Sequence, residues 1–546
     1  MIAQFASRQS SRLRTDSFWR ICYWIALVFV FAWAVWQRFA LPLDPIADPD
    51  TWGYLSPALR KLTGAEFGHS QARNFLYPGF LYFVLRCFGD FRAIAIVQHL
   101  LGMAAGGFLL LTWRRLRAFV PNPCVNPSLY DALGLVGTAI YLLASDTTRI
   151  ETQLRPEGVC AFLISINLYF AVQFISYSFL LHRRAGAVVC ASATVLTSLL
   201  LASAKPSFWF PAIVVMVPVA AFFLRQNWWR QKIALGFATA LIASVVLWPE
   251  QILSREDEAC QTSVPTMLFV IHADLIRDQM TEDLKENARL PYSREWLERV
   301  YTALNSEITK SRMKYPGHYA LLNFDPEYLW FDPGSIVAQL SREFGNNLPA
   351  RCAFFRFYYW RTWQRRPLRA LQKVARQFSI YYFPNCPAYT PMKIWPLSEV
   401  YERAVNSLDL EEYRKIAPSL PILADFMQRT KSLAHNAPAT KQAGLLRKAL
   451  TDLAVSYLPI VLLTLILSAI IFLRPRWRRL RRLAVLVLFG WAYNAASCLE
   501  VAIVNSLEVH RYITVQMYAT LLTQFVALWL ILEFAVEIRQ HNRAVV

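Results

Sequence analysis

The sequence predicts an all-α polytopic membrane protein, with a transmembrane bundle of about ten spans and one mostly helical domain outside the membrane. Of its 546 residues, 55% are hydrophobic and 17% are charged, a composition too apolar for an ordinary soluble protein. Apolar runs long enough to cross about 30 Å of hydrocarbon recur along the chain. Basic residues cluster between these runs, so the net charge of +20 follows the pattern of membrane orientation rather than that of a nucleic-acid surface.

The apolar runs predict the transmembrane helices in chain order. They fall near 18–41, 92–113, 130–145, 158–181, 186–203, 207–224, 232–249, 452–473, 483–504 and 512–532. The run at 130–145 is the shortest of them. The first run is long and no small-residue cleavage site follows it, so we expect a retained anchor rather than a removed signal peptide.

The basic clusters occupy every second connection between the predicted spans. They lie in the N-terminal tail, at 114–117, 182–184, 225–232 and 474–482, and in the C-terminal tail. With about ten spans, all of these clusters fall on one side, which the positive-inside tendency identifies as the cytoplasm. Both termini are then expected in the cytoplasm. The opposite side receives 42–91, 146–157, 204–206, 250–451 and 505–511.

These spans divide the chain into three segments. Residues 1–249 form an N-terminal transmembrane module with a long first outer loop at 42–91, residues 250–451 form an extracytoplasmic domain, and residues 452–546 form C-terminal transmembrane helices. The amphipathic stretch 75–88 predicts a helix along the membrane surface. Two further stretches, 295–314 and 397–413, have helical periodicity.

Aromatic and basic residues alternate closely between Phe354 and Trp363. Such interleaving can stack nucleic acid. Outside a membrane it predicts an interfacial helix instead, with rings at headgroup depth and arginines on lipid phosphates, framing an entrance for a lipid substrate. We therefore expect no nucleic-acid partner. The nine cysteines show neither a CxxC pair nor a metal-ligand spacing, and a disulfide among Cys260, Cys352 and Cys386 stays open.

The candidate functional residues are polar groups near span ends on the outer side. Asp48 and Asp50 follow the first span directly, and Tyr54 shares a helical face with Asp50 if a helix begins there. The other candidates are Arg73, Tyr77, Glu151, Arg155, Glu157, Lys205, His510 and Arg511. Asp50 could simply cap a helix, and single charges at span ends are usually solvated. Their convergence on one face favours a transfer reaction, because a carboxylate can accept the acceptor's proton while cations hold a leaving phosphate.

These motifs resemble those of the GT-C superfamily, the integral-membrane glycosyltransferases that use polyprenyl-phosphate sugars. Asp48-Pro49-Asp50 resembles the family's DxD-type element in the first outer loop, and the Asp-x-x-x-Tyr spacing to Tyr54 also fits. The stretch Arg73–Phe80 resembles the proline-containing start of the family's second surface helix, and His510-Arg511-Tyr512 resembles the Arg-Tyr pair before a late span. Within the superfamily, the chain resembles the bacterial enzymes that are similar to protein O-mannosyltransferases and to aminoarabinose transferases of lipid A. The chain differs in its large outer domain between the seventh and eighth spans.

The resemblance implies a function that the structure can be compared with. A sugar would move from a polyprenyl-phosphate donor to an envelope lipid, glycan or protein on the outer face of the bacterial inner membrane, with inversion by direct displacement. Asp50 would be the general base, with Asp48 second. The other roles assigned by resemblance are phosphate binding by Arg73, Lys205 and Arg511, sugar orientation by Glu151 and Glu157, and substrate binding by Tyr54, Tyr77, Arg155 and His510. No cofactor is expected with certainty, and a divalent cation is compatible but not required, because only one phosphate leaves.

Two other classes of protein remain open at this point. One is a transporter or flippase of lipid-linked saccharides, and the other is a non-catalytic envelope-assembly protein. A transporter would place ionisable residues within its spans, near the midplane. The predicted spans are nearly free of charge, with Gln98 and His99 as the main exceptions, and a single histidine of this kind usually makes a packed interhelical hydrogen bond.

Overall fold

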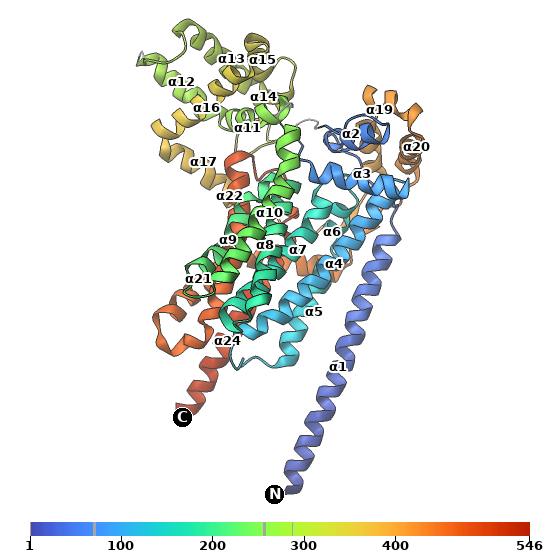
Figure 1. Cartoon of the computed structure of the whole chain (residues 1–546), viewed down its shortest axis with the longest axis vertical. Helices are drawn as coiled ribbons and strands as arrows, with labels where there is room; N and C mark the ends of the chain where they lie inside the picture. The colour runs from blue at the N-terminus through green and yellow to red at the C-terminus, as the bar shows by residue number, and fades with distance from the viewer. Residues whose placement is uncertain (1, 69–72, 255–257, 287, 546) are drawn as a thin grey trace.

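The computed structural model describes residues 2–68, 73–254, 258–286 and 288–545 as an almost entirely helical chain (Figure 1). Within these residues, nine helices are long and apolar enough to cross a membrane, or up to eleven if each of two bent pairs counts as one span. The predicted class, an all-α polytopic membrane protein, is confirmed.

The nine spans match nine of the predicted runs. They comprise α1 (Ile2–Phe39), α4 with η1 (Arg92–Leu116, Arg117–Phe119), α7 with η2 (Glu157–Ile175, Ser176–Leu180), α8 (Arg184–Ala204), η3 with α9 (Pro206–Phe208, Trp209–Leu224), α10 (Trp229–Ser254), α21 (Gly444–Leu473), η5 with α22 (Pro475–Leu480, Arg481–Val504) and α24 (Met517–Val545). The remaining run, at 130–145, is α5 (Pro127–Leu143), which bends by 51° into α6 (Ser145–Glu151). A bend at this point explains why the apolar run is short.

Among the described residues, eight of the nine spans contribute buried side chains to one apolar core, and Leu235 of α10 belongs to a smaller one. Trp113 on α4, Tyr130 on α5 and Trp529 on α24 meet inside the larger core, and the indole of Trp113 donates a hydrogen bond to the Tyr130 carbonyl at 2.8 Å. The two ends of the chain lie at one end of this bundle, and the outer helices lie at the other (Figure 1). This arrangement has the polarity that the alternating basic clusters predict. Which side faces the cytoplasm stays a prediction.

The outer region forms two lobes rather than one domain. The large outer lobe consists of α11 (Glu258–Ile271), α12 (Ala273–Lys285), α13 (Arg294–Lys314), α14 (Pro326–Phe331), α15 (Ile336–Phe344), α16 (Leu348–Arg365) and α17 (Pro367–Ser379). The small outer lobe consists of α18 (Leu397–Leu408), α19 (Glu411–Ile416), η4 (Ala417–Ser419) and α20 (Pro421–Asn436), flanked by the antiparallel strands β1 (Ile394–Trp395) and β2 (Thr440–Lys441). The lobes have separate apolar cores, and the flanking spans α10 and α21 extend to Ser254 and Gly444, into the range predicted as the outer domain.

The aromatic stretch in α16 does not form an interfacial helix, so that prediction is wrong for most of its rings. Phe354, Phe355 and Tyr358 are fully buried in the core of the large outer lobe, and Phe355 lies 4.7 Å from the ring of Phe269. The interleaved arginines serve the same lobe, since Arg361 makes two hydrogen bonds with Asp283 at 2.6 and 2.7 Å. An amphipathic aromatic helix packs as well on other helices as on a membrane, and here α11 to α13 cover it.

The small outer lobe packs on the first outer loop, where α2 (Thr51–Leu62) and α3 (Leu76–Phe88) lie. Arg429 pairs with Asp44 at 2.6 Å and with Asp90 at 3.1 Å, and the hydroxyl of Tyr401 donates to the Asp44 carbonyl at 2.6 Å. Charged and apolar contacts therefore hold both ends of this loop against the lobe.

Candidate functional site

Asp50 lies at the centre of a cluster of ion pairs on the outer side of the bundle. Its Oδ1 atom accepts a hydrogen bond from Arg73 at 2.8 Å, and its Oδ2 atom pairs with Arg511 and lies 3.6 Å from Arg155. Asp50 occupies the N-cap position of α2, but its side chain makes no capping hydrogen bond. The side chain of Asp50 therefore does not act as a helix cap, and the alternative in which capping is its only role does not hold.

Asp48 forms the second carboxylate of the cluster and pairs with Arg155. Two local features direct it there. The backbone amide of Asp50 donates to Asp48 Oδ1 at 2.8 Å, and the hydroxyl of Thr51 accepts from the Asp48 amide at 2.8 Å, which fixes the turn. A short parallel bridge joins Ile46 to Gln153, so the segment carrying Asp48 runs beside the loop carrying Arg155.

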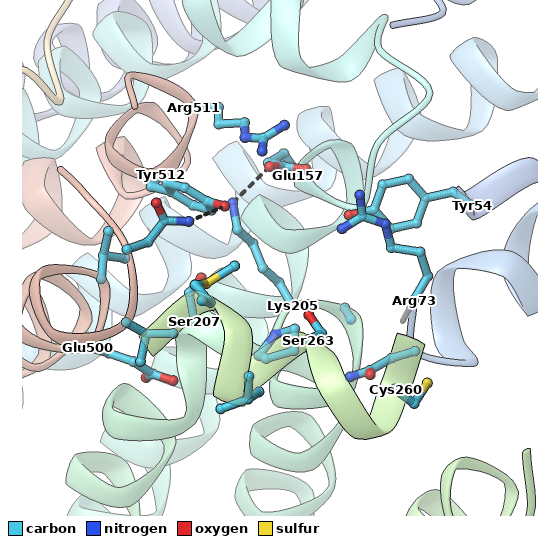
Figure 2. A pocket seen from close by; sticks show the side chains of 18 of the residues that line it. Tyr54, Arg73, Glu157, Lys205, Ser207, Cys260, Ser263, Glu500, Arg511 and Tyr512 are labelled. Carbon is cyan, nitrogen blue, oxygen red and sulfur yellow. Dashed lines mark hydrogen bonds and ion pairs between the residues drawn. The ribbon is translucent and has the colours of Figure 1, made fainter. Parts of the chain in front are cut away.

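Lys205 extends the cluster toward the ends of the spans. It ends α8 with an extended backbone, φ −149° and ψ 109°, as expected for a residue before proline. Its side chain is buried, with the ammonium 2.8 Å from Glu157 Oε1 and 4.6 Å from the ring centre of Tyr512 (Figure 2). Glu157 is the first residue of α7, where a carboxylate also gains from the helix dipole. Arg511 lies above this pair in the view of Figure 2, and Arg73 and Tyr54 lie on the side opposite Tyr512.

Two cavities meet at these side chains. The inner cavity has a volume of about 420 Å³, and its walls include the span ends at Ala204, Glu250 and Val504. The outer cavity has a volume of about 820 Å³ and lies against the large outer lobe. Arg73, Arg511 and Tyr512 line both cavities, while Lys205 and Glu157 line the inner one and Asp50 and Arg155 line the outer one.

The ion-pair cluster holds four cations, Arg73, Arg155, Lys205 and Arg511, and three carboxylates, Asp48, Asp50 and Glu157. Burial and, to a smaller extent, repulsion from Arg511 lower the pKa of Arg155 to about 10, so this residue keeps its charge at neutral pH. Burial also raises the pKa of Tyr54, which therefore remains a neutral hydroxyl. The seven side chains of the cluster carry one net positive charge, and its arginines and lysine can bind an anion.

Three predicted site residues lie outside this cluster. Glu151 is buried with Arg38 and His99, at 2.8 Å from each, because an arginine buried at the end of α1 needs a carboxylate partner. Tyr77 is buried, with its hydroxyl 3.0 Å from Gln98. His510 is exposed and lies 3.1 Å from the hydroxyl of Thr390. None of the three lines either cavity within the described residues, so a direct role in orienting substrate does not fit them.

Sequence reasoning missed carboxylates at the ends of spans. Glu250 on α10 accepts from the Phe75 amide at 2.8 Å and supports the start of α3, and Glu500 on α22 accepts from the Phe210 amide at 2.8 Å and supports the start of α9. Both line the inner cavity. A carboxylate next to or within an apolar run is a signal that could have identified them. His99 behaves as predicted for a packed hydrogen-bonding histidine, since its Nδ1 lies against Glu151.

The arrangement can bind a phosphate and offers a carboxylate beside it. Arg73, Lys205 and Arg511 approach the shared wall of the cavities from three different segments, and Asp50 lies between two of them. In the part of the chain that the structure describes, no group of three or more histidine, cysteine or acidic side chains could hold a metal ion. Cys352 and Cys386 are free thiols.

The fold and the site define a multi-pass helical membrane protein with a charged cavity at one end of its bundle. Comparison of the chain with protein-family models, with curated proteins and with solved structures finds no match.

Proposed function

We propose that this protein is a membrane glycosyltransferase that moves a sugar from a polyprenyl-phosphate donor to an envelope acceptor, on the outer face of the bacterial inner membrane. The observation that carries the proposal is the position of Asp50. This carboxylate is held by Arg73 and Arg511 at the wall shared by a cavity at the span ends and a cavity outside them. A polar acceptor in the outer cavity can then reach Asp50, while a lipid-linked phosphate in the inner cavity reaches Arg73 and Arg511.

The reaction follows from these positions. Asp50 accepts the proton of the acceptor hydroxyl, and that oxygen forms a bond to the anomeric carbon of the donor sugar. The bond from that carbon to the phosphate oxygen breaks, and its electron pair leaves with the polyprenyl phosphate. A carboxylate has about four lone-pair sites, so Asp50 can accept this proton while it keeps contacts with arginine.

Charge balance supports the same step. The bound donor is a phosphodiester with one negative charge, which Arg73, Lys205 and Arg511 can offset from the wall of the inner cavity. After transfer the leaving phosphate gains a negative charge and Asp50 gains a proton, so the site stays balanced. Preorganised cations of this kind stabilise developing charge without rearrangement. A divalent cation is compatible with this chemistry but is not needed to balance it.

The test is transfer by the full-length protein in nanodiscs, supplied with radiolabelled polyprenyl-phosphate sugars and an envelope extract as acceptor. Arg511→Ala and Lys205→Ala should weaken binding of the lipid phosphate, and each should lower transfer by roughly 10²–10³-fold. Arg92→Ala is a matched control, because Arg92 is an exposed outer arginine paired with Asp90 and lines neither cavity in the described chain. Equal loss of transfer in the control and the site variants would refute the proposal.

A further inference from the structure

The outer cavity differs in kind from the inner one. Among the described residues, none that lines the outer cavity belongs to the nine membrane spans, whereas several that line the inner cavity do. The inner cavity is therefore within reach of a lipid, and the outer one opens on the side of the large outer lobe. Its volume of about 820 Å³ lies within the range of roughly 300–1,000 Å³ typical of ligand sites.

A pair of aromatic rings forms one wall of the outer cavity. Trp330 and Phe331, at the end of α14, stack with ring centres 5.0 Å apart and planes only 3° from parallel. Phe331 is 70% exposed, whereas Phe354, Phe355 and Tyr358 of the same lobe are buried. A partly exposed aromatic platform on the wall of a cavity presents an apolar face to a ligand.

The helix that carries these rings is held rigidly. Asp325 is buried and caps α14 by accepting hydrogen bonds from the amides of Glu327, at 2.8 Å, and Tyr328, at 3.2 Å. Leu329, on the opposite face, is fully buried in the core of the lobe. The platform is thus preorganised, which reduces the entropy lost when a ligand binds.

Polar groups complete the cavity around the platform. Glu327 lines the cavity, interacts with Tyr319 and lies close enough to Arg155 to raise the pKa of that arginine. Asp50, Arg73 and Arg511 line the same cavity. Carboxylates accept hydrogen bonds and arginines donate them, so the walls can pair with several hydroxyl groups while the aromatic rings cover an apolar face. A pyranose ring has this combination of apolar C–H faces and hydroxyl edges.

We propose that the outer cavity is a saccharide site, and that the acceptor of the transfer reaction is therefore a glycan or the sugar headgroup of a glycolipid. The identification of the bound saccharide as the acceptor rests on the proposed function, whereas saccharide binding itself does not. The sugar packs on Trp330 and Phe331, Glu327 accepts from its hydroxyls, and one hydroxyl points at Asp50. The donor phosphate occupies the inner cavity, so the two substrates approach Asp50 from different sides.

The experiment measures saccharide binding without turnover. Full-length protein in nanodiscs is mixed with a panel of methyl glycosides and short oligosaccharides of hexoses, pentoses and N-acetylhexosamines, and saturation-transfer NMR detects contact with ring C–H protons. At least one member should give signals that fall five-fold or more in Trp330→Ala and Phe331→Ala. Trp360→Ala is the control, because Trp360 is an exposed tryptophan of the same lobe, at 59%, that does not line the cavity.

Two results would overturn this inference. One is a panel in which no saccharide gives a signal that Trp330→Ala or Phe331→Ala removes. The other is a serine-rich peptide that binds in a Trp330-dependent way while the saccharides do not, which would mark a protein acceptor. Binding of farnesyl phosphate, measured in parallel with Arg511→Ala, separates the two proposals. If saccharides bind and the lipid phosphate does not, the saccharide site stands and glycosyl transfer from a lipid donor fails. The converse result removes only the saccharide site.

Discussion

Replacing Asp50 with asparagine should lower turnover and, at the same time, tighten binding of the lipid phosphate. Asp50 pairs with Arg73 at 2.8 Å and also with Arg511. In the proposed reaction, both arginines bind the donor phosphate. The phosphate must compete with this carboxylate. Asparagine keeps the shape of the side chain but removes both the charge and the base.

The size of the effect follows from the geometry. A unit charge about 4 Å from an arginine near a protein surface contributes at most ~4 kcal/mol. The three side chains are each about one quarter exposed, at 26% for Asp50, 27% for Arg73 and 29% for Arg511, so solvent screening reduces the net gain to on the order of 1 kcal/mol. This corresponds to a phosphate affinity about five-fold tighter. Loss of the proton acceptor should lower turnover by roughly 10²–10⁴-fold.

The assay separates binding from chemistry. Dissociation constants for farnesyl phosphate are measured on nanodisc-embedded protein, and transfer is measured with the complete donor. Asp278→Asn is the matched control, since Asp278 is an outer carboxylate paired with Arg277 and Arg369 and lines neither cavity in the described chain. The reasoning is refuted if Asp50→Asn retains near-normal turnover, or if it binds farnesyl phosphate more weakly than the native protein while its thermal unfolding is unchanged.

Three further predictions concern stability and orientation. A methyl group at Gly102 would overlap the buried carboxylate of Glu151, so Gly102→Ala should lower the free energy of unfolding by ~3 kcal/mol or more. Gly107→Ala, on the same helix, is the control, because its methyl group meets open space and should leave the free energy of unfolding unchanged. Equal melting temperatures of the two variants would contradict this prediction. Burial lowers the pKa of Lys373 from 10.5 to about 7. Between pH 7 and pH 10, the unfolded chain therefore carries a proton on Lys373 that the folded chain lacks, so the free energy of unfolding should rise by ~1.4 kcal/mol per pH unit. Thermal unfolding of Lys373→Met should not show this dependence on pH. Finally, an engineered cysteine in the N-terminal tail should resist an impermeant thiol reagent in intact cells while one on α13 reacts, and the reverse pattern would invert the proposed orientation.

The sequence by itself determined the transmembrane architecture. A helix rises 1.5 Å per residue, so an apolar run of about 20 residues predicts a span wherever it occurs. Nine of the ten predicted runs are spans in the described structure, and the tenth is the bent pair of α5 and α6. The sequence also located the charged residues at the span ends, because a charge is costly inside the hydrocarbon.

Local pattern could not decide how the aromatic stretch in α16 is covered. An amphipathic helix with rings on one face has the same sequence whether it lies on a membrane or on other helices. Phe354 and Tyr358 are buried because α11 and α13 cover them, and those helices lie up to about a hundred residues away in the chain. The division of 250–451 into two lobes is a consequence of the same kind of long-range packing.

Only the tertiary structure decided which charged groups meet. Asp50 and Arg511 are 461 positions apart, and Asp48 and Arg155 are 107 apart, so neither pair leaves a local signal in the sequence. Glu151 and Glu157 looked equivalent because they share one short loop. Glu151 closes α6 and neutralises Arg38 inside the bundle, whereas Glu157 opens α7 and meets Lys205 in the cavity. Chemical type and distance from the membrane can be read from a single chain, but the pairing of charges depends on how the helices rotate and pack against one another.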